Sequence, residues 1–590
     1  MKKRIFCLVV ALCLLAGLFT ACGSDEKGEP LFAERGEAQR APLGELVPAA
    51  DAEALLEALR EAGQNHSADW DDASERAVPG VRLDVARAAD GDTVATDGSY
   101  IYMLDSYGLV IFSAAGRESE ILSYTRVERE GAGWAERLCV TQDRVAVVST
   151  VSDSGLDAEG SWHDEAEVRV TLLDTADKRK PQKLADASVE GSLVEARLVD
   201  GTLCLVTRRS LLTLPEKAEA LLPQIRENGK ALPLRAGEVY LSQNPARAAL
   251  TIAAAIRLSD GRIADALAFT DEVEAVCGEG GDFYLSRTFW EETASAPRQE
   301  APYTVTDYTT TARTEIKHLR FDGTLKLAGG CVLEGALPDP GALSLQNGGL
   351  CLAVETDERS FSAYTDEQHG WTNYEQHSHN RSSQLTLLDP ELRAVGALTR
   401  LGGEQSVSAC RFLGGLAWMS AAGTDALYTA DLSDPSAPVM NDSLPGQGET
   451  LILRSFGEGL ALGLAASAEA EWQLVMFDLS DPANPKEADS LRLKNWTPAA
   501  ELSDTAAFFT DPANCLIGFP AVGKNGIEYL LVRWTGTELK EKGAFTLEYV
   551  PASTRGLLLN GLLYLCSPGE VYVTDPETMK VVATVSNAVG

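Results

Sequence analysis

The sequence predicts an all-β protein: a single β-propeller of about eight blades, with seven to nine allowed, preceded by a short helix and a disordered tether. Three observations lead to this prediction. A strand followed by an aspartate turn recurs along the chain, most plainly as DLSDPSAPV at 431–439 and DLSDPANPK at 478–486. A hairpin centred on Gly precedes most copies, as in LQNGGLCLAV and RFLGGLAWMS. Between them, β-branched, leucine and aromatic residues alternate without helical periods.

Each repeat has the pattern of two hairpins, hence about four strands in roughly 40 to 60 residues. In the turns, the Asp carboxylate can accept hydrogen bonds from backbone N–H groups two residues on, and Pro ends the strand. One small sheet cannot bury both faces alone, so the repeats must pack in a series. Nine copies lie between about residues 89 and 587, and they give eight blades if the first and last segments complete one sheet.

Calcium binding is the alternative role for the aspartate turns. It would use Asp431, Asp434, Asp478 and Asp481. Their spacing is not that of a calcium-binding loop, so we expect turn formation instead.

Residues 1–21 have the pattern of a lipoprotein signal peptide. The basic residues KKR precede an apolar run that ends at Phe19, and the small residue Ala21 precedes Cys22. The end of this segment resembles the lipobox of bacterial lipoproteins, although Phe19 stands where a leucine is usual. We expect Cys22 to carry a diacylglyceryl group that anchors the exported chain to the extracytoplasmic side of the membrane or envelope. The alternative is an ordinary secretory signal with an incidental cysteine.

The next segments precede the propeller, which we expect over residues 89–590. Residues 22–48 are predicted to be a flexible tether, because their Gly, Pro and charged residues leave little to bury. Residues 49–88 are predicted to hold a short helix and a linker. The helix is expected over 51–60, with Asp51 as its N-cap, Gly63 as its stop and an apolar stripe formed by Leu55, Leu56 and Leu59.

Composition restricts the partners. The chain has 51 Lys and Arg against 87 Asp and Glu, a formal net charge of −36. A field of this sign repels phosphate backbones, so no nucleic-acid partner is expected. The cysteines after Cys22 occur singly in strand-like segments such as RLCV and LYLC, which favours buried free thiols over disulfides. We expect a monomer without a cofactor.

Several stretches resemble one known family. They include VATDGSYIYMLD, MFDLSDPANPKEADS and TRGLLLNGLLYLCSPGEVYVTD. They resemble exported prokaryotic proteins whose C-terminal β-propeller is distantly related to tryptophan–aspartate repeats. The resemblance covers most of residues 89–588 and the helix before them. It implies a propeller in a secreted, often membrane-tethered protein, and it carries over no functional residues because the matching stretches are structural.

Three long insertions are the candidate binding loops. They lie between the second and third strands of their repeats, at 152–165, 291–315 and 356–383. Equivalent loops emerge on the same face of a propeller, so we expect all three to meet there. Aromatic rings among hydroxyl and amide groups suit sugars and peptides. The candidate ligand-binding residues are Trp162, Trp290, Tyr303, Tyr308, Tyr364, Trp371 and Tyr374. The alternative is that the insertions are disordered or cover one another as structural lids.

Metal binding and catalysis have weaker signals. His377 and His379 alternate and would share one side of a strand, where His369 could join them around a transition metal, but histidines in a solvated loop are more often simple polar residues. No catalytic residue is assigned, because the sequence has no GxSxG, HExxH or Gly-rich phosphate loop.

Three functions therefore compete. We favour a lipid-anchored, non-catalytic module that binds a cell-envelope glycan, peptide or protein through the long-loop face. The first alternative is a surface hydrolase or lyase acting on glycans, because propeller enzymes assemble carboxylate pairs from distant blades. The second alternative is a scaffold for envelope assembly.

Overall fold

The computed structural model describes residues 33–38, 40–64, 82–85, 92–105, 108–127, 132–156, 162–211, 213–243, 247–402, 406–421, 426–444, 450–466, 471–499 and 505–586. Strands dominate this part of the chain, and α2 (Ala52–Gln64) is the one α-helix within it. The predicted signal peptide and Cys22 lie outside the described residues. Nowhere in the described ranges is there a helix long and apolar enough to cross a membrane.

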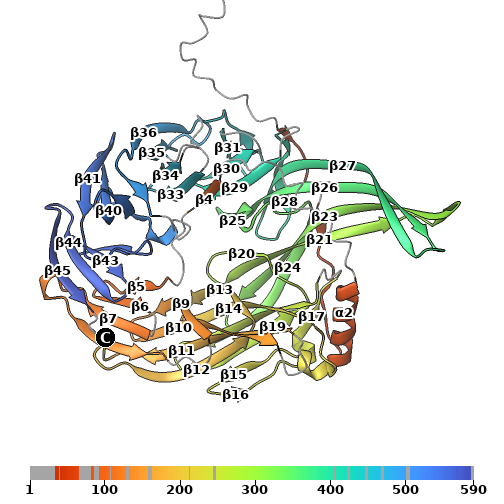
Figure 1. Cartoon of the computed structure of the whole chain (residues 1–590), viewed down its shortest axis with the longest axis horizontal. Helices are drawn as coiled ribbons and strands as arrows, with labels where there is room; N and C mark the ends of the chain where they lie inside the picture. The colour runs from red at the N-terminus through yellow and green to blue at the C-terminus, as the bar shows by residue number, and fades with distance from the viewer. Residues whose placement is uncertain are drawn as a thin grey trace, which may run out of the picture.

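Most strands form antiparallel units of four that follow one another along the chain, and the units form a ring (Figure 1). Unit 1 consists of β5 (Val94–Thr96), β6 (Tyr100–Leu104), β7 (Gly108–Ser113) and β8 (Ile121–Arg126). Unit 2 consists of β9 (Ala132–Val140), β10 (Arg144–Leu156), β11 (Trp162–Asp174) and β12 (Gln182–Glu190). Unit 3 consists of β13 (Ser192–Val199), β14 (Thr202–Ser210), β18 (Ala249–Arg257) and β19 (Ile263–Phe269). Unit 4 consists of β20 (Ala275–Cys277), β21 (Asp282–Ala294), β23 (Tyr303–Phe321) and β24 (Leu325–Glu334). Unit 5 consists of β25 (Leu343–Gln346), β26 (Gly349–Asp366), β27 (Trp371–Leu388) and β28 (Ala394–Leu401). Unit 6 consists of β29 (Val407–Leu413), β30 (Leu416–Ala421), β31 (Leu427–Asp431) and β32 (Val439–Met440).

Units 7 to 9 complete the ring. Unit 7 consists of β33 (Thr450–Ser455), β34 (Leu460–Ala466), β35 (Trp472–Asp478) and β36 (Lys486–Arg492). Unit 8 consists of β38 (Phe509–Asp511), β39 (Leu516–Gly523), β40 (Gly526–Trp534) and β41 (Leu539–Phe545). Unit 9 consists of β42 (Arg555–Leu559), β43 (Leu562–Ser567), β44 (Glu570–Asp575) and β45 (Lys580–Ser586). The described strands thus group into nine units, of which units 4 and 5 join in one 11-stranded sheet. The all-β propeller prediction is confirmed; the strands form nine units where about eight blades were expected.

The ring closes through side chains and not through a shared sheet, which differs from the expectation. Units 1 and 9 each contain four strands that are consecutive in the chain. Ile101 and Val110 of unit 1 pack in one core cluster with Tyr564 and Val571 of unit 9. Arg555 also pairs with Asp92, with Nε and Nη2 at 2.7 and 3.1 Å from its carboxylate oxygens. No strand exchange is needed because both terminal repeats are complete.

The aspartate turns behave as their sequence predicts. Asp431 Oδ1 accepts a hydrogen bond from Ser433 N–H at 2.8 Å, between β31 and β32. Asp478 Oδ1 accepts one from Ser480 N–H at 3.0 Å, after β35. Each carboxylate therefore fixes the turn between the third and fourth strands of a unit.

The helix prediction is also confirmed, with one change. Asp51 Oδ1 accepts a hydrogen bond from Ala54 N–H at 2.9 Å, as an N-cap should. The three leucines are buried in the core cluster that contains Leu221 and Val239 beside unit 3. The helix runs to Gln64, one residue beyond Gly63, so that glycine is not its stop.

Part of the predicted tether lies on the propeller. We call residues 33–48 the N-terminal strap; its short strands pair with the outer edges of units 5, 4 and 3 in turn. These strands are β1 (Glu34–Arg35) on β28, β2 (Arg40–Pro42) on β24, and β3 (Val47–Pro48) on β17 (Val239–Leu241), a strand added to β19. Composition did not indicate this, because edge pairing uses backbone groups and needs little side-chain burial. Further on, β4 (Arg82–Val85) pairs in parallel with β33, the first strand of unit 7.

All of the cysteines after Cys22 except Cys515 are buried. Burial raises the pKa of Cys204, Cys351 and Cys566 to about 12. They pack as small apolar residues, as the sequence predicts.

Candidate binding site

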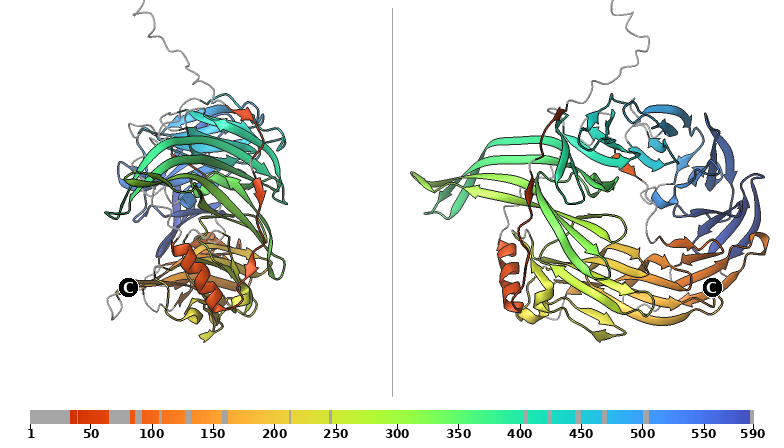
Figure 2. Two further views of the ribbon diagram at one scale, coloured as in Figure 1. Left: turned by 90° about the vertical axis from the view of Figure 1, so that its right-hand side faces the viewer. Right: turned by 180° about the vertical axis from the view of Figure 1, so that it is seen from behind.

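Two of the three insertions form one arm. We define the arm as residues 288–312 of unit 4 and 356–383 of unit 5, with β22 (Arg298–Glu300) paired to the start of β23. It projects from the ring as the green ribbons in Figures 1 and 2. The hairpins β21–β23 and β26–β27 continue past the ring and pair with each other, from Thr304 with Thr365 to Thr311 with Glu358. The segment YTVTDYTTTARTE is rich in β-branched residues, which favour extended strands.

The first insertion lies elsewhere. Its strands β10 and β11 stay within the sheet of unit 2, where Leu156 is paired with Trp162. The side chain of Trp162 lies outside what the structure describes. The structure therefore joins the second and third insertions in one sheet, and the other six candidate aromatic residues all belong to the arm or to its base.

One side of the arm, face A, carries three rings near the tip. Strand alternation and register place Tyr303, Tyr364 and Trp371 on this side. The Tyr303 ring centroid lies 6.1 Å from that of Tyr364 and 5.5 Å from that of Trp371, and both pairs meet edge to face. Trp371 keeps 44% of its surface exposed, so face A presents an open aromatic surface.

The opposite side, face B, carries a second row. Tyr308 stacks on Phe361 at 5.2 Å, and Tyr374 meets Phe361 edge to face at 5.9 Å. Nearer the ring, the Arg359 guanidinium lies 5.2 Å from the Trp290 ring centroid. Trp290 and Tyr374 are 38% and 48% exposed, whereas Phe361 is buried. Phe361 was not among the predicted residues, although its place in the alternation opposite Tyr308 makes it the centre of this row.

The three histidines do not meet. His369 Nδ1 lies 2.9 Å from Asp366 Oδ2, His377 Nε2 lies 2.6 Å from Ser362 Oγ, and His379 Nε2 lies 3.0 Å from Asp357 Oδ1. A β-bulge opposite Ser360 and Phe361 shifts the register, so His377 faces side A and His379 faces side B. Within the described residues, no three His, Cys, Asp or Glu side chains are arranged to hold a metal ion.

The arm contains the residue types of an acyl-transfer triad at Asp307, Ser362 and His377, but their hydrogen bonds do not connect them as a triad requires. The Ser362 hydroxyl donates to Asp307. This bond and Arg298 hold the pKa of Asp307 below its usual range. Because a hydroxyl has one proton, Ser362 cannot also donate to His377, as an activated nucleophile must. The cluster is suited to ordering the arm and not to attacking a substrate.

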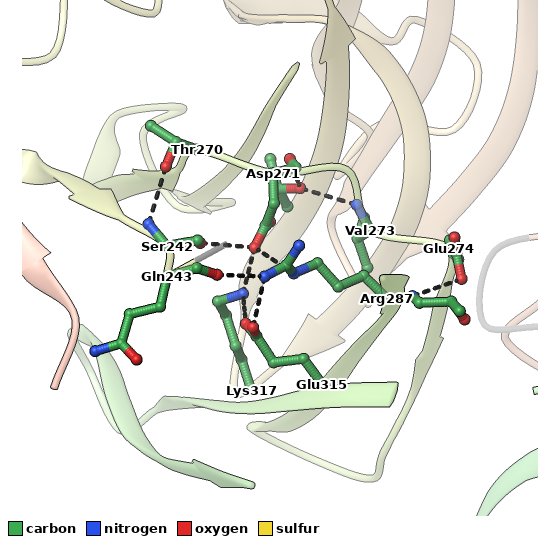
Figure 3. A network of polar contacts seen from close by, with 11 residues as sticks. Ser242, Gln243, Thr270, Asp271, Val273, Glu274, Arg287, Glu315 and Lys317 are labelled. Carbon is green, nitrogen blue, oxygen red and sulfur yellow. Dashed lines mark hydrogen bonds and ion pairs between the residues drawn. The ribbon is translucent and has the colours of Figure 1, made fainter. Parts of the chain in front are cut away.

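A buried ionic network lies at the base of the arm (Figure 3). Asp271 follows β19, Arg287 belongs to β21, and Glu315 and Lys317 belong to β23; all four side chains are at most 5% exposed. Arg287 Nη2 lies 2.7 Å from Glu315 Oε2, and Arg287 Nε lies 3.2 Å from Asp271 Oδ2. Lys317 pairs with both carboxylates. Burial alone would raise the pKa of Asp271, but the charges of Lys317 and Arg287 keep it lowered.

This network is structural. Two cations balance two anions in the interior, and Ser242 Oγ donates to Asp271 at 2.7 Å. With its groups paired and out of contact with solvent, the network joins unit 3 to unit 4 and offers nothing to a ligand. The sequence contains one signal for this network, because Glu315 and Lys317 alternate on one side of the strand segment EIKHL.

Comparison with known proteins identifies the family. Residues 83–579 match the family model described as the beta propeller domain. Uncharacterized proteins of Methanocaldococcus jannaschii and Archaeoglobus fulgidus are each 28% identical to this chain, over 202 and 203 residues. Each match covers 34% of this chain and 31% of the relative, so the chain spans about a third of the length of these relatives.

Among solved structures, a prolyl endopeptidase resembles 93% of this chain over 63% of its own chain, at 11% identity and a TM-score of 0.31. A likeness at this level carries no argument about activity. The family match, in contrast, covers most of the chain from β4 to the last turn of unit 9. The protein therefore belongs to the beta propeller domain family.

Proposed function

We propose that the protein is a lipid-anchored extracytoplasmic module that binds a cell-envelope glycan, peptide or protein, without catalysis, through the arm. One observation carries the proposal: the arm gathers aromatic side chains on both faces and leaves Trp290, Trp371 and Tyr374 between 38% and 48% exposed. Large exposed rings are costly to leave in water, and clusters of them mark interaction surfaces.

The build of the arm favours binding. Tyr and Trp have few rotatable bonds, so they lose little entropy when they contact a ligand. Strand pairing from Thr304 to Thr311 holds the rings in a fixed arrangement before any ligand arrives. Hydroxyl groups of the surrounding threonines and serines supply hydrogen bonds beside the rings.

The proposed anchor would hold the arm near the membrane. The N-terminal strap begins its pairing at Glu34 on β28, in the same unit as β26 and β27 of the arm. Eleven residues lie between Cys22 and Glu34, and a fully extended chain over these 12 positions spans at most roughly 40 Å. A lipid on Cys22 would thus place Glu34, at the outer edge of the unit that carries β26 and β27, within that distance of the bilayer surface.

A binding screen tests the proposal. The exported chain, with Cys22→Ser to prevent acylation, is applied to arrays of peptidoglycan fragments, glycans and peptides, beside the variant Trp290→Ala/Trp371→Ala/Tyr374→Ala. Trp134→Ala is the matched control, because Trp134 is 51% exposed but lies in unit 2, away from the arm. We expect array ligands that the parent chain and the control bind and that the triple variant loses, with an unchanged melting temperature. Equal binding by all three proteins would contradict a site on the arm.

A further inference from the structure

The two faces of the arm differ in charge near the tip. Segments 298–307 and 362–377 contain five carboxylates, at Glu300, Asp307, Asp366, Glu367 and Glu375, and one Arg or Lys, at Arg298. Five negative charges and one positive charge give these segments a formal charge of −4 with His neutral. The register places Glu300 opposite Tyr303, and Glu375 opposite Ser362, on face A. Four of the five, Glu300, Asp307, Asp366 and Glu375, therefore share face A with the Tyr303, Tyr364 and Trp371 rings, whereas Glu367 bonds to Thr304 on face B.

The contacts of these carboxylates show how the charge is distributed. Arg298 pairs with Glu300 at 2.7 Å and with Asp307, so the chain itself already holds one guanidinium at this site. Glu367 Oε1 accepts a hydrogen bond from the Thr304 hydroxyl at 3.0 Å. Glu375 accepts one from the Tyr364 hydroxyl. A hydroxyl partner does not neutralise a carboxylate, so the charge of Glu375 remains available to a cation on face A, where Glu300 and Asp307 share the single guanidinium of Arg298.

Aromatic faces beside carboxylates attract cations. The ring quadrupole is negative on its face, and a Lys or Arg group within about 6 Å of a Trp or Tyr centroid is stabilised. Face B shows that this arm supports such a contact, because Arg359 lies over Trp290. The formal charge of −36 on the whole chain also steers cationic partners toward it and repels anionic ones.

We propose that face A of the arm tip binds an extended basic peptide segment of a partner protein. Its Lys or Arg side chains would lie over Trp371 and Tyr303 and pair with Glu300 and Glu375. An extended peptide fits better than a single small cation, because the two glutamates lie beside different strands and alternate side chains of a strand are about 7 Å apart. This inference rests on the proposed function of the arm and specifies its ligand.

The probe is a labelled peptide of ten residues in which Lys and Ser alternate, titrated against the full exported chain carrying Cys22→Ser. Peptides with Gln or Glu in place of Lys are the ligand controls. Two face A variants, Trp371→Ala and Glu300→Gln/Glu375→Gln, remove the ring and the charges separately. The matched controls are Glu292→Gln, because Glu292 projects from the other side of the same sheet, and Trp134→Ala, because Trp134 lies in unit 2, away from the arm.

We expect the Lys peptide to bind the parent chain, the Gln and Glu peptides not to bind, and affinity to fall as salt rises. Each face A variant should weaken binding by about tenfold, within the range of a cation–aromatic contact, and the two control variants should change it less than about twofold. Melting temperatures of all variants should match the parent, because the substituted side chains are exposed.

Two results would overturn the inference. Equal binding of the Lys peptide to parent and face A variants would mean attraction to the acidic surface in general. No binding of the Lys peptide would also contradict it. If the array screen still finds ligands lost in the triple aromatic variant, the arm remains a binding site and only the basic peptide is excluded. If that screen also finds no arm-dependent ligand, the proposed function fails as well.

Discussion

The strands β21 and β23 pass through two contrasting environments. At the base of the arm they contribute Arg287, Glu315 and Lys317 to a network sealed from solvent (Figure 3). Toward the tip, the same hairpin carries Trp290, which is 38% exposed, and Tyr303 in the face A cluster. Charged groups are thus inside and aromatic groups outside, the reverse of the usual distribution. The comparison indicates that the base of the arm stabilises the fold and that the tip contacts a ligand. Substitutions at the base should therefore change stability, and substitutions at the tip should change ligand affinity.

The largest effect is expected from Lys317→Met at the base. Removing this cation leaves Asp271 and Glu315 buried with Arg287 as their remaining cationic partner, which should lower the free energy of unfolding by about 3–5 kcal/mol. Denaturant unfolding followed by tryptophan fluorescence measures the change. Lys326→Met is the matched control, because the Lys326 pair with Asp322 is 61% and 51% exposed and should contribute less than about 1 kcal/mol. Similar losses in both variants would mean that the network has no special role.

Phe361→Ala tests the middle of the arm. Phe361 is 6% exposed and stacks on Tyr308, so its removal should cost about 3 kcal/mol locally. We expect faster amide hydrogen exchange in β23 and β26 beyond the ring, while exchange in units 6 to 9 stays unchanged. Tyr374→Ala, on the exposed flank of the same row, should have a smaller effect. A loss of protection throughout the ring would show that arm and ring unfold together.

Low pH should destabilise the buried ionic network at the base of the arm before it affects the aromatic rings at the tip. Lys317 and Arg287 lower the pKa of Asp271 below the ordinary 3.8. A carboxyl group with a lowered folded pKa stabilises the fold above its unfolded pKa, and this contribution is lost as pH falls through the folded pKa. At pH values below about 4, the melting temperature of the parent should therefore fall. The difference in melting temperature between the parent and Asp271→Asn should shrink in the same pH range. A difference that stays constant down to pH 2 would contradict the assignment.

The smallest effect on stability is expected from Trp371→Ala at the tip. With 44% of its surface exposed, this side chain should change the free energy of unfolding by no more than about 0.5 kcal/mol. The same variant should lose affinity for the basic peptide. A large drop in melting temperature would show instead that the face A rings hold the arm together.

Local chemistry in the sequence predicted much of the fold. The aspartate at each turn and the N-cap at Asp51 are set by hydrogen bonds within a few residues, and the leucine stripe of α2 follows the helical period, so these features can be predicted from the sequence directly. Features that join distant segments were missed or only partly expected. The strap pairs through backbone groups that every residue has, and the two insertions pair with each other because their units are neighbours in the ring.

The candidate site shows the same division. Aromatic enrichment in the insertions pointed to the six residues of the arm region, but not to which rings share a face. The bulge opposite Ser360 and Phe361 changes the side on which His377 lies, and one such register shift reverses an inference from alternation. The balanced charges of the base could be suspected only from Glu315 and Lys317, because Asp271 and Arg287 come from other strands.

Closure of the ring has a consequence for how the chain folds. Asp92 and Arg555, which meet across the closure, are 463 residues apart in sequence. Contacts of such separation form late, since a very long loop must first be ordered. Until the last unit is complete, Ile101 and Val110 on one end and Val571 on the other lack their partners. The nascent propeller is therefore an open arc with an exposed apolar surface at each end. It depends on rapid closure, or on a chaperone bound at those ends, to avoid associating with another copy of the chain.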